Sequence, residues 1–243
     1  MSSIYAIGDI HGELGMLEQA LRWIEKDGGL DAHIIFLGDY VDRGPDSKRV
    51  LDLLIQGQKL CRNWVFLKGN HDRMFDWFLQ TPSRSDPHLF IDLSWLHERL
   101  GGQNTLKSYG LHFKNRYRLN ELHLAALEVV PDNHHKFLTN CQLSYENKDL
   151  YFCHAGIKPG VALQNQREED LLWIRDEFHH FRGQHDKIIV HGHTPLDGAT
   201  HYNNRINLDS GSGYGQSLTA AVFEGTDCYI LSAKGRVQLF PKN

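Results

Sequence analysis

Short apolar runs along the chain alternate with segments in which apolar residues recur every three or four positions. The apolar runs predict buried strands at residues 4–7, 34–37, 64–67, 150–153 and 188–190. The periodic segments at 13–26 and 47–58 predict amphipathic helices, whose buried faces carry Leu14, Leu17, Leu21 and Ile24, and Val50, Leu51 and Leu54. Strands that alternate with helices predict βαβ units and a largely parallel sheet, so we expect an α/β fold.

Two other regions have different patterns. After residue 186, short apolar runs between glycine-rich turns predict mostly strands, at 205–208, 219–223, 228–232 and 236–240. Residues 81–147 mix helical patches with polar turns, which predicts a helical insertion that covers one side of a site. A chain of 243 residues with 41% hydrophobic content can bury one sizeable core, and we expect a single domain over residues 1–243.

Charge and cysteine usage argue against several classes of protein. The formal net charge is −4, so there is no global basic field to attract nucleic acid or an anionic membrane. There is no basic leader and no apolar stretch of about 18 residues. The four cysteines lack CxxC spacing, which is typical of reduced core residues: Cys61, Cys141, Cys153 and Cys228. We expect a cytoplasmic protein without a membrane or nucleic-acid partner.

Polar blocks follow five of the predicted strands. They read GDIHG at 8–12, GDYVDRG at 38–44, GNHD at 69–72, HAG at 154–156 and HGHTP at 191–195. In open α/β sheets, ligands collect beyond the carboxyl ends of the strands, and these blocks lie there. Alternation along an extended segment puts Asp9 and His11 on the same side, so that both can bind one cation.

The blocks predict a centre with two divalent metal ions. Asp39 is the predicted bridge, because a carboxylate has two oxygens and two-metal hydrolytic sites hold their ions about 3.5–4 Å apart. Mixed Asp, His and Asn ligation favours manganese, iron or zinc over calcium. We interpret His191 as a structural neighbour rather than a ligand. The six predicted ligands are Asp9, His11, Asp39, Asn70, His154 and His193.

Such a centre predicts hydrolysis of a phosphate ester. A hydroxide that bridges two cations has a lowered pKa and can attack phosphorus in line, so no side-chain nucleophile is required. Arg43 and Arg175, with Asn70, are the predicted phosphate-binding residues. His71 is the predicted acid for the departing alkoxide, with Asp42 as the carboxylate that orients it. For Tyr214 two interpretations stay open, a place in the pocket wall and packing on the core.

These blocks resemble the calcineurin-like metallophosphoesterase superfamily, and within it the phosphoprotein phosphatases, whose signatures are GDxHG, GDxVDRG and GNH followed by Glu or Asp. The resemblance extends through residues 154–156, 172–175, 192–195 and 207–211, and so covers most of the chain except 81–147. It implies a four-layer α/β/β/α sandwich of two mixed sheets. It also implies a bacterial-type serine/threonine phosphatase that hydrolyses phosphorylated proteins or peptides by direct attack of metal-bound water, commonly with manganese.

Three alternative functions stay open. A similar sister group splits dinucleoside tetraphosphates symmetrically, and its members tend to carry alanine where this chain has Asp42, so Asp42 favours a phosphatase. A non-catalytic scaffold is disfavoured, because degenerate members lose ligands and all six are present here. A nucleic-acid phosphodiesterase is disfavoured by the net charge and by Pro195, which stands where many such relatives have a second histidine. The GNHD block departs from the GNHE more usual in eukaryotic phosphatases.

Overall fold

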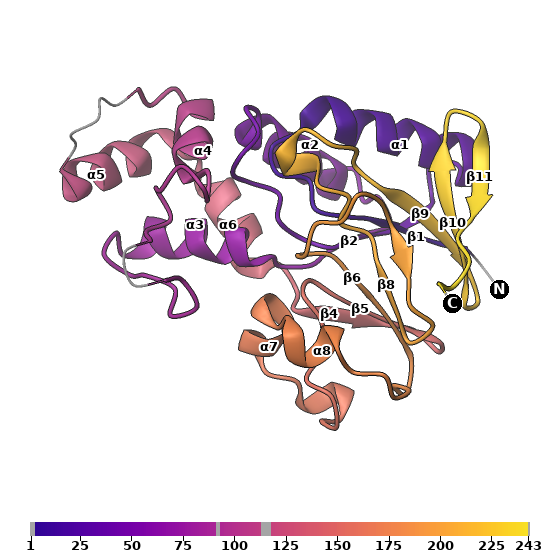
Figure 1. The fold of residues 1–243 in the computed structure, drawn as a ribbon. Coiled ribbons are helices and arrows are strands. Elements are labelled where there is room, and N and C mark those ends of the chain that lie inside the picture. Colours follow the sequence, from indigo (N-terminus) through magenta and orange to yellow (C-terminus); the bar gives the residue numbers. More distant parts are fainter. Residues whose placement is uncertain (1–2, 91–92, 113–117, 243) are drawn as a thin grey trace.

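Two mixed β-sheets lie at the centre of the fold in a computed structural model, which describes residues 3–90, 93–112 and 118–242 (Figure 1). The six-stranded sheet has the order β11-β10-β9-β1-β2-β3, in which β1, β2 and β3 are parallel. Its strands are β1 (Ile4–Ile7), β2 (His33–Phe36), β3 (Trp64–Phe66), β9 (Ala220–Glu224), β10 (Asp227–Ser232) and β11 (Gly235–Gln238).

The five-stranded sheet has the order β4-β5-β6-β8-β7, with β5, β6 and β8 parallel and the two outer strands antiparallel to their neighbours. Its strands are β4 (Ser144–Glu146), β5 (Leu150–Cys153), β6 (Ile188–His191), β7 (Thr200–His201) and β8 (Arg205–Asn207). The five strands predicted for the first 190 residues and the β-rich last quarter are therefore confirmed, with boundaries that differ from the prediction by at most two residues.

Alternation along each strand divides the core into layers. In β1, Tyr5 and Ile7 pack under the helices, while Ala6 faces the other sheet. In β5, Phe152 faces the first sheet and packs edge-on against Phe223, whereas Tyr151 belongs to the cluster on the outer face. Helices cover both outer faces, so the α/β/β/α arrangement of two mixed sheets is confirmed (Figure 1).

The helices fall into three groups. The first sheet is covered by α1 (Leu14–Gly28) and α2 (Ser47–Lys59), the two amphipathic helices that the sequence predicts. The second sheet is covered by α7 (Glu168–Trp173) and α8 (Asp176–His179), which follow the short turn η1 (Leu163–Asn165). A lobe beside the sheets holds α3 (Asn70–Gln80), α4 (Gly102–Ser108), α5 (Leu119–Val129) and α6 (Asp132–Asn140) (Figure 1).

The helical insertion predicted for 81–147 is thus largely confirmed, except that Ser144–Glu146 forms an edge strand. Parts of it, 91–92 and 113–117, lie outside the described residues. Cys141, Cys153 and Cys228 are buried as expected, but Cys61 is exposed in the turn after α2, so its assignment to the core was wrong. None of the helices in the ranges described above is long and apolar enough to cross a bilayer.

Candidate active site

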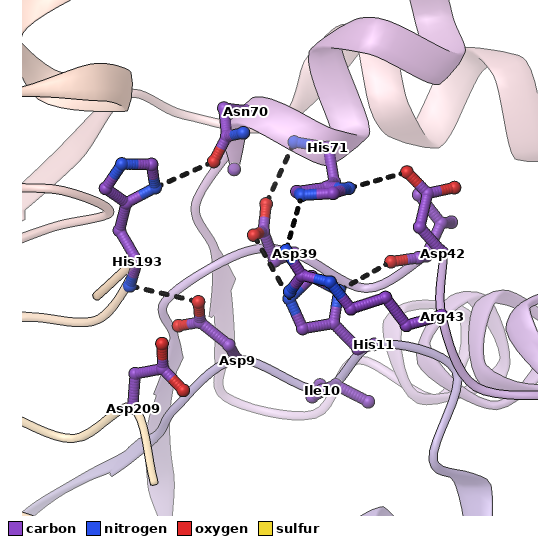
Figure 2. Close-up of polar contacts among 12 residues, drawn as sticks. Asp9, Ile10, His11, Asp39, Asp42, Arg43, Asn70, His71, His193 and Asp209 are labelled. Atoms are coloured by element: carbon purple, nitrogen blue, oxygen red, sulfur yellow. Dashed lines mark hydrogen bonds and ion pairs between the residues drawn. The ribbon is translucent and has the colours of Figure 1, made fainter. Parts of the chain in front are cut away.

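All six predicted ligands come together at one end of the two sheets, and Figure 2 labels five of them, Asp9, His11, Asp39, Asn70 and His193. Asp9 follows β1, Asp39 follows β2, and Asn70 is the first residue of α3, directly after β3. His154 follows β5 and His193 follows β6, so the second sheet contributes from the opposite side. Each of the six side chains is at least nine-tenths buried. The convergence at the carboxyl ends of parallel strands is the arrangement expected from the sequence.

The backbone is strained where it presents these groups. Of the seven non-glycine residues with positive φ among those described, five are predicted site residues. Left-handed backbone is unfavourable for residues with a Cβ, and it persists where the surrounding structure over-determines it. The five are His11, Asp39, Asp42, Arg43 and His193, with φ between 47° and 73°. This clustering marks the loops as built to hold side chains in fixed positions.

Asp39 lies between two imidazoles. The Nδ1–H of His11 donates to the carbonyl of Val41 at 2.9 Å, so its Nε2 lone pair is directed toward the centre, 3.4 Å from Oδ2 of Asp39. His154 behaves in the same way: its Nδ1–H donates to the carbonyl of Leu37, and its Nε2 lies 3.5 Å from Oδ1 of Asp39. Each oxygen of one carboxylate therefore faces the lone pair of a different histidine.

A second set of acceptors converges around Asn70. Its Oδ1 lies 2.9 Å from Nε2 of His154 and 2.9 Å from Nδ1 of His193. Since the proton of His154 is on Nδ1, its Nε2 and the amide oxygen are two acceptors in contact. Oδ1 of Asp9 is buried without a hydrogen-bond partner. Acceptors that face one another in a buried site repel, and cations between them remove that repulsion, so the donor set fits two divalent metal ions.

The pKa shifts in the site disfavour the charged form of both the carboxyl groups and the imidazoles. Burial raises the pKa of Asp39 to about 7, and burial together with the carboxylates of Asp209 and Asp39 raises the pKa of Asp9 well above its usual value. Burial lowers the pKa of His154 to about 4 and that of His11 well below its usual range, so both imidazoles are neutral. Neutral imidazoles are the form that binds metal ions, whereas the raised pKa values of Asp9 and Asp39 show that their ionised forms lack a compensating positive charge, which divalent cations would supply.

Asp209 is a site residue that the sequence reasoning did not single out. It is 4% exposed and lies beside Asp9 in the site (Figure 2). Its Oδ1 accepts a hydrogen bond from the backbone N–H of Gly211 at 2.9 Å. From the sequence, residues 207–211 show only a resemblance to the family. A single Asp after a short apolar run does not indicate that it will lie beside Asp9, 200 residues earlier.

His71 and Asp42 form the predicted pair. Nδ1 of His71 lies 2.7 Å from Oδ2 of Asp42, and both side chains are buried. Trp95 donates from its indole to Oδ2 of Asp42 at 2.8 Å, and the hydroxyl of Thr105 donates to Oδ1 at 2.7 Å. The helical insertion thus holds the carboxylate of Asp42 in place. Residues 81–147 lack a clear pattern, so this contact could not be predicted from the sequence.

Asp72 explains the last letter of the GNHD block. Its carboxylate accepts hydrogen bonds from the backbone N–H groups of Gly69, Asp39 and Tyr40 at 2.7–2.9 Å. Asp72 is fully buried in the first turn of α3 and joins the start of that helix to the loop after β2. The effect is to fix Asn70 and Asp39 relative to each other.

The two predicted phosphate-binding arginines differ in environment. Arg43 is half-buried; its guanidinium contacts Nε2 of His11 and lies 3.1 Å from Nε2 of His71. Arg175 is exposed at the junction of α7 and α8. Its charge opposes the burial that raises the pKa of Asp39 and adds to the burial that lowers the pKa of His193. Tyr214 is 59% exposed and stacks under the guanidinium of Arg43 at 4.6 Å, so its packing on the core is excluded.

The backbone of Gly192 lies against the carboxylate of Asp9 and leaves no room for a side chain. A Cβ at this position would lie 1.9 Å from Oδ1 of Asp9, so Gly192→Ala must displace that carboxylate. We expect kcat/KM on p-nitrophenyl phosphate to fall by about a hundredfold with the circular dichroism spectrum unchanged, since a displacement of about 1 Å has that effect in preorganised sites. Gly198→Ala is the matched control, because a Cβ there has no atom within 4 Å. Equal activity in the two variants would contradict this geometry.

Comparison with known proteins agrees with the site geometry in indicating a metal-dependent phosphoesterase. The model of the calcineurin-like phosphoesterase family matches residues 2–224. The asymmetrical bis(5'-nucleosyl)-tetraphosphatase PrpE of Anoxybacillus flavithermus is 28% identical over 251 residues, covering 88% of this chain and 87% of that protein. The PrpE protein of Oceanobacillus iheyensis carries the same name and is 27% identical. The match covers 89% of this chain and 87% of that protein.

Among solved structures, the cold-active protein-tyrosine phosphatase of a psychrophilic Shewanella species superimposes with a TM-score of 0.67. The match covers 99% of this chain and 81% of that chain at 17% identity, which shows a common fold. The family match, which spans nearly the whole chain, adds the activity class. The chain belongs to the calcineurin-like phosphoesterases and is a metallophosphoesterase that hydrolyses phosphate esters.

Proposed function

We propose that the protein is a phosphomonoesterase with two metal ions, of the phosphoprotein phosphatase type, that acts on phosphoserine or phosphothreonine in proteins or peptides. The observation that carries the proposal is the buried pair of His71 and Asp42, 2.7 Å apart beside the predicted ligands. A serine or threonine alkoxide is a poor leaving group and needs a proton donor as the ester bond breaks. The leaving group of a phosphoanhydride does not.

The proposed roles follow from the contacts. Asp9, His11 and Asp39 would hold one divalent cation, and Asp39, Asn70, His154 and His193 the other, with manganese, iron or zinc suited to these donors. Bound cations supply Lewis-acid charge neutralisation and a nucleophilic water at neutral pH. Arg43 and Arg175 would bind phosphate oxygens, with the Asn70 amide beside them. In this proposal His71 acts as an imidazolium that the Asp42 carboxylate would stabilise, and it would donate its Nε2 proton to the alkoxide once the guanidinium of Arg43, 3.1 Å from Nε2, turns to the phosphate.

Hydrolysis of dinucleoside tetraphosphates is the second candidate. It is supported by the names of the PrpE proteins, which are 27–28% identical over nearly the whole length of the chain. Those names specify asymmetrical cleavage, whereas the sister group considered from the sequence cleaves symmetrically. The same metal ligands and arginines would serve a phosphoanhydride, so this candidate differs from the first in substrate and in its use of His71.

A direct comparison of substrates separates the two candidates. We expect the manganese-loaded protein to have a higher kcat/KM on a phosphoserine peptide than on diadenosine tetraphosphate. Inorganic phosphate release and nucleotide products, measured in parallel with the same enzyme preparation, give both constants. A preference for the dinucleotide would leave the metal ligands in place and overturn the proposed substrate.

Replacement of His71 tests its role as the acid. His71→Asn should lower kcat on a phosphoserine peptide by about a hundredfold or more, and kcat on p-nitrophenyl phosphate far less, because nitrophenolate leaves without protonation. His112→Asn is the control, since His112 is an exposed histidine outside the site. Equal losses on both substrates would remove His71 from the acid role.

A further inference from the structure

A second polar cavity lies on the outer side of the five-stranded sheet, between α8 and the β7–β8 hairpin. Its volume is about 650 Å³, and it contains none of the predicted metal ligands. The loop after β6 separates it from the metal centre: the side chain of His193 belongs to the centre, while Thr194 and Leu196 line the cavity. The cavity therefore adjoins the active site without being part of it.

Arg205, at the base of this cavity, is a buried cation without an ionic partner. Its side chain is 5% exposed, because Ile206 takes the inward position on β8 and Arg205 the outward one, under α8. The guanidinium donates to Nε2 of His191 at 3.2 Å and to the carbonyl of His179 at 3.5 Å, and its Nε–H has no partner. It forms no ion pair with any residue in the described ranges. A buried charge that lacks a counter-ion is costly, so the site is incomplete with protein groups alone.

Two further cations surround Arg205 instead of a carboxylate. The guanidinium of Arg182 donates to the same carbonyl of His179 at 3.2 Å, and burial, with a smaller contribution from the charge of Arg182, lowers the pKa of Arg205. Lys242 lies over the ring of Tyr202 at 5.8 Å, and Arg205 stacks on that ring at 3.7 Å. Among the described residues that line the cavity, none is acidic. The charges of Arg182 and Lys242 are exposed and screened by solvent, so Arg205 is the buried cation for which an anion in the cavity would supply a counter-charge.

Neutral donors complete the cavity, and its walls are held in place. Thr194 and His179 are also lining residues, and the hydroxyl of Thr194 and Nε2 of His179 are buried without hydrogen-bond partners. The side-chain amide of Asn204 donates to the carbonyls of Phe181 and Gly183, at 3.3 and 2.8 Å, and so fixes the loop that carries Arg182 against the hairpin. The loop that carries Arg182 and the hairpin that carries Arg205 are therefore held together by these hydrogen bonds.

We propose that this cavity, which we call the Arg205 cavity, binds a phosphate group at a second site distinct from the metal centre. Arginine pairs form planar, charge-assisted hydrogen bonds to phosphate oxygens, and Thr194 adds a hydroxyl side chain to the cavity wall. The ligand is inorganic phosphate or a phosphate monoester such as a nucleoside monophosphate, for which the volume leaves room. Because Thr194 follows the predicted ligand His193, an anion bound here would contact the loop that carries it.

Equilibrium dialysis with radiolabelled inorganic phosphate tests the proposal by counting sites on the manganese-loaded protein. We expect two phosphates per chain for the wild type, one for Arg205→Met, and a second site weakened by about tenfold or more for Arg182→Met, which loses a charge-assisted contact. Arg182 is exposed, so its variant keeps the test open if Arg205→Met does not fold. Arg22→Met, which removes an exposed charge from α1, is the matched control and should bind as the wild type does.

Arg43→Met separates the two sites. It should weaken the phosphate at the metal centre and leave a phosphate whose binding is lost when Arg205→Met is added. Displacement of that phosphate by adenosine monophosphate at lower concentration than by phosphate identifies a phosphate ester as the ligand, and the reverse order identifies inorganic phosphate. A binding count that neither Arg205→Met nor Arg182→Met alters would overturn the proposal, whatever substrate the metal centre hydrolyses.

Discussion

The carboxylate of Asp39 faces two histidine lone pairs, one at each of its oxygens, and the rest of the site is arranged around that contact. Hydrogen bonds from Nδ1 of His11 and His154 to backbone carbonyls fix both tautomers. The guanidinium of Arg43 contacts Nε2 of His11, whereas Nε2 of His154 faces the acceptor oxygens of Asp39 and Asn70, which repel it. Cations convert the repulsion into attraction. The fold therefore places buried acceptor groups face to face between its two sheets, where divalent cations would stabilise them.

Holding that arrangement requires support on every side. The loops that present the ligands adopt left-handed backbone at residues with side chains, and they keep it because neighbouring groups leave no alternative. Asp72 binds three backbone N–H groups and couples α3 to the loop after β2. Trp95 and Thr105 hold Asp42, and Asp42 holds His71. The helical insertion thus contacts the site through Asp42: Trp95 and Thr105 donate hydrogen bonds to Asp42, and Asp42 is hydrogen-bonded to His71.

The first sheet, its helices and the six convergent residues could be predicted because each is local in sequence: an apolar run, then a turn that carries a polar side chain. What escaped prediction depends on distant partners. Asp209 matters because it lies beside Asp9, and Trp95 because it reaches Asp42 from a segment without clear periodicity. Arg205 resembled any arginine in a strand, since only the packing of α8 over β8 makes it a buried cation. Cys61 was assigned to the core from composition, although it lies in an exposed turn.

The central proposal is that Asp39 would be a ligand of both divalent cations, and metal content tests it most directly. Protein reconstituted with manganese and freed of excess metal should hold two ions per chain by mass spectrometry, with the magnetic coupling of a bridged pair in its electron paramagnetic resonance spectrum. Asp39→Asn should hold at most one and lose the coupling, while the exposed control Asp31→Asn should keep both. A single ion in the wild type, or two coupled ions with near-normal turnover in Asp39→Asn, would contradict the account.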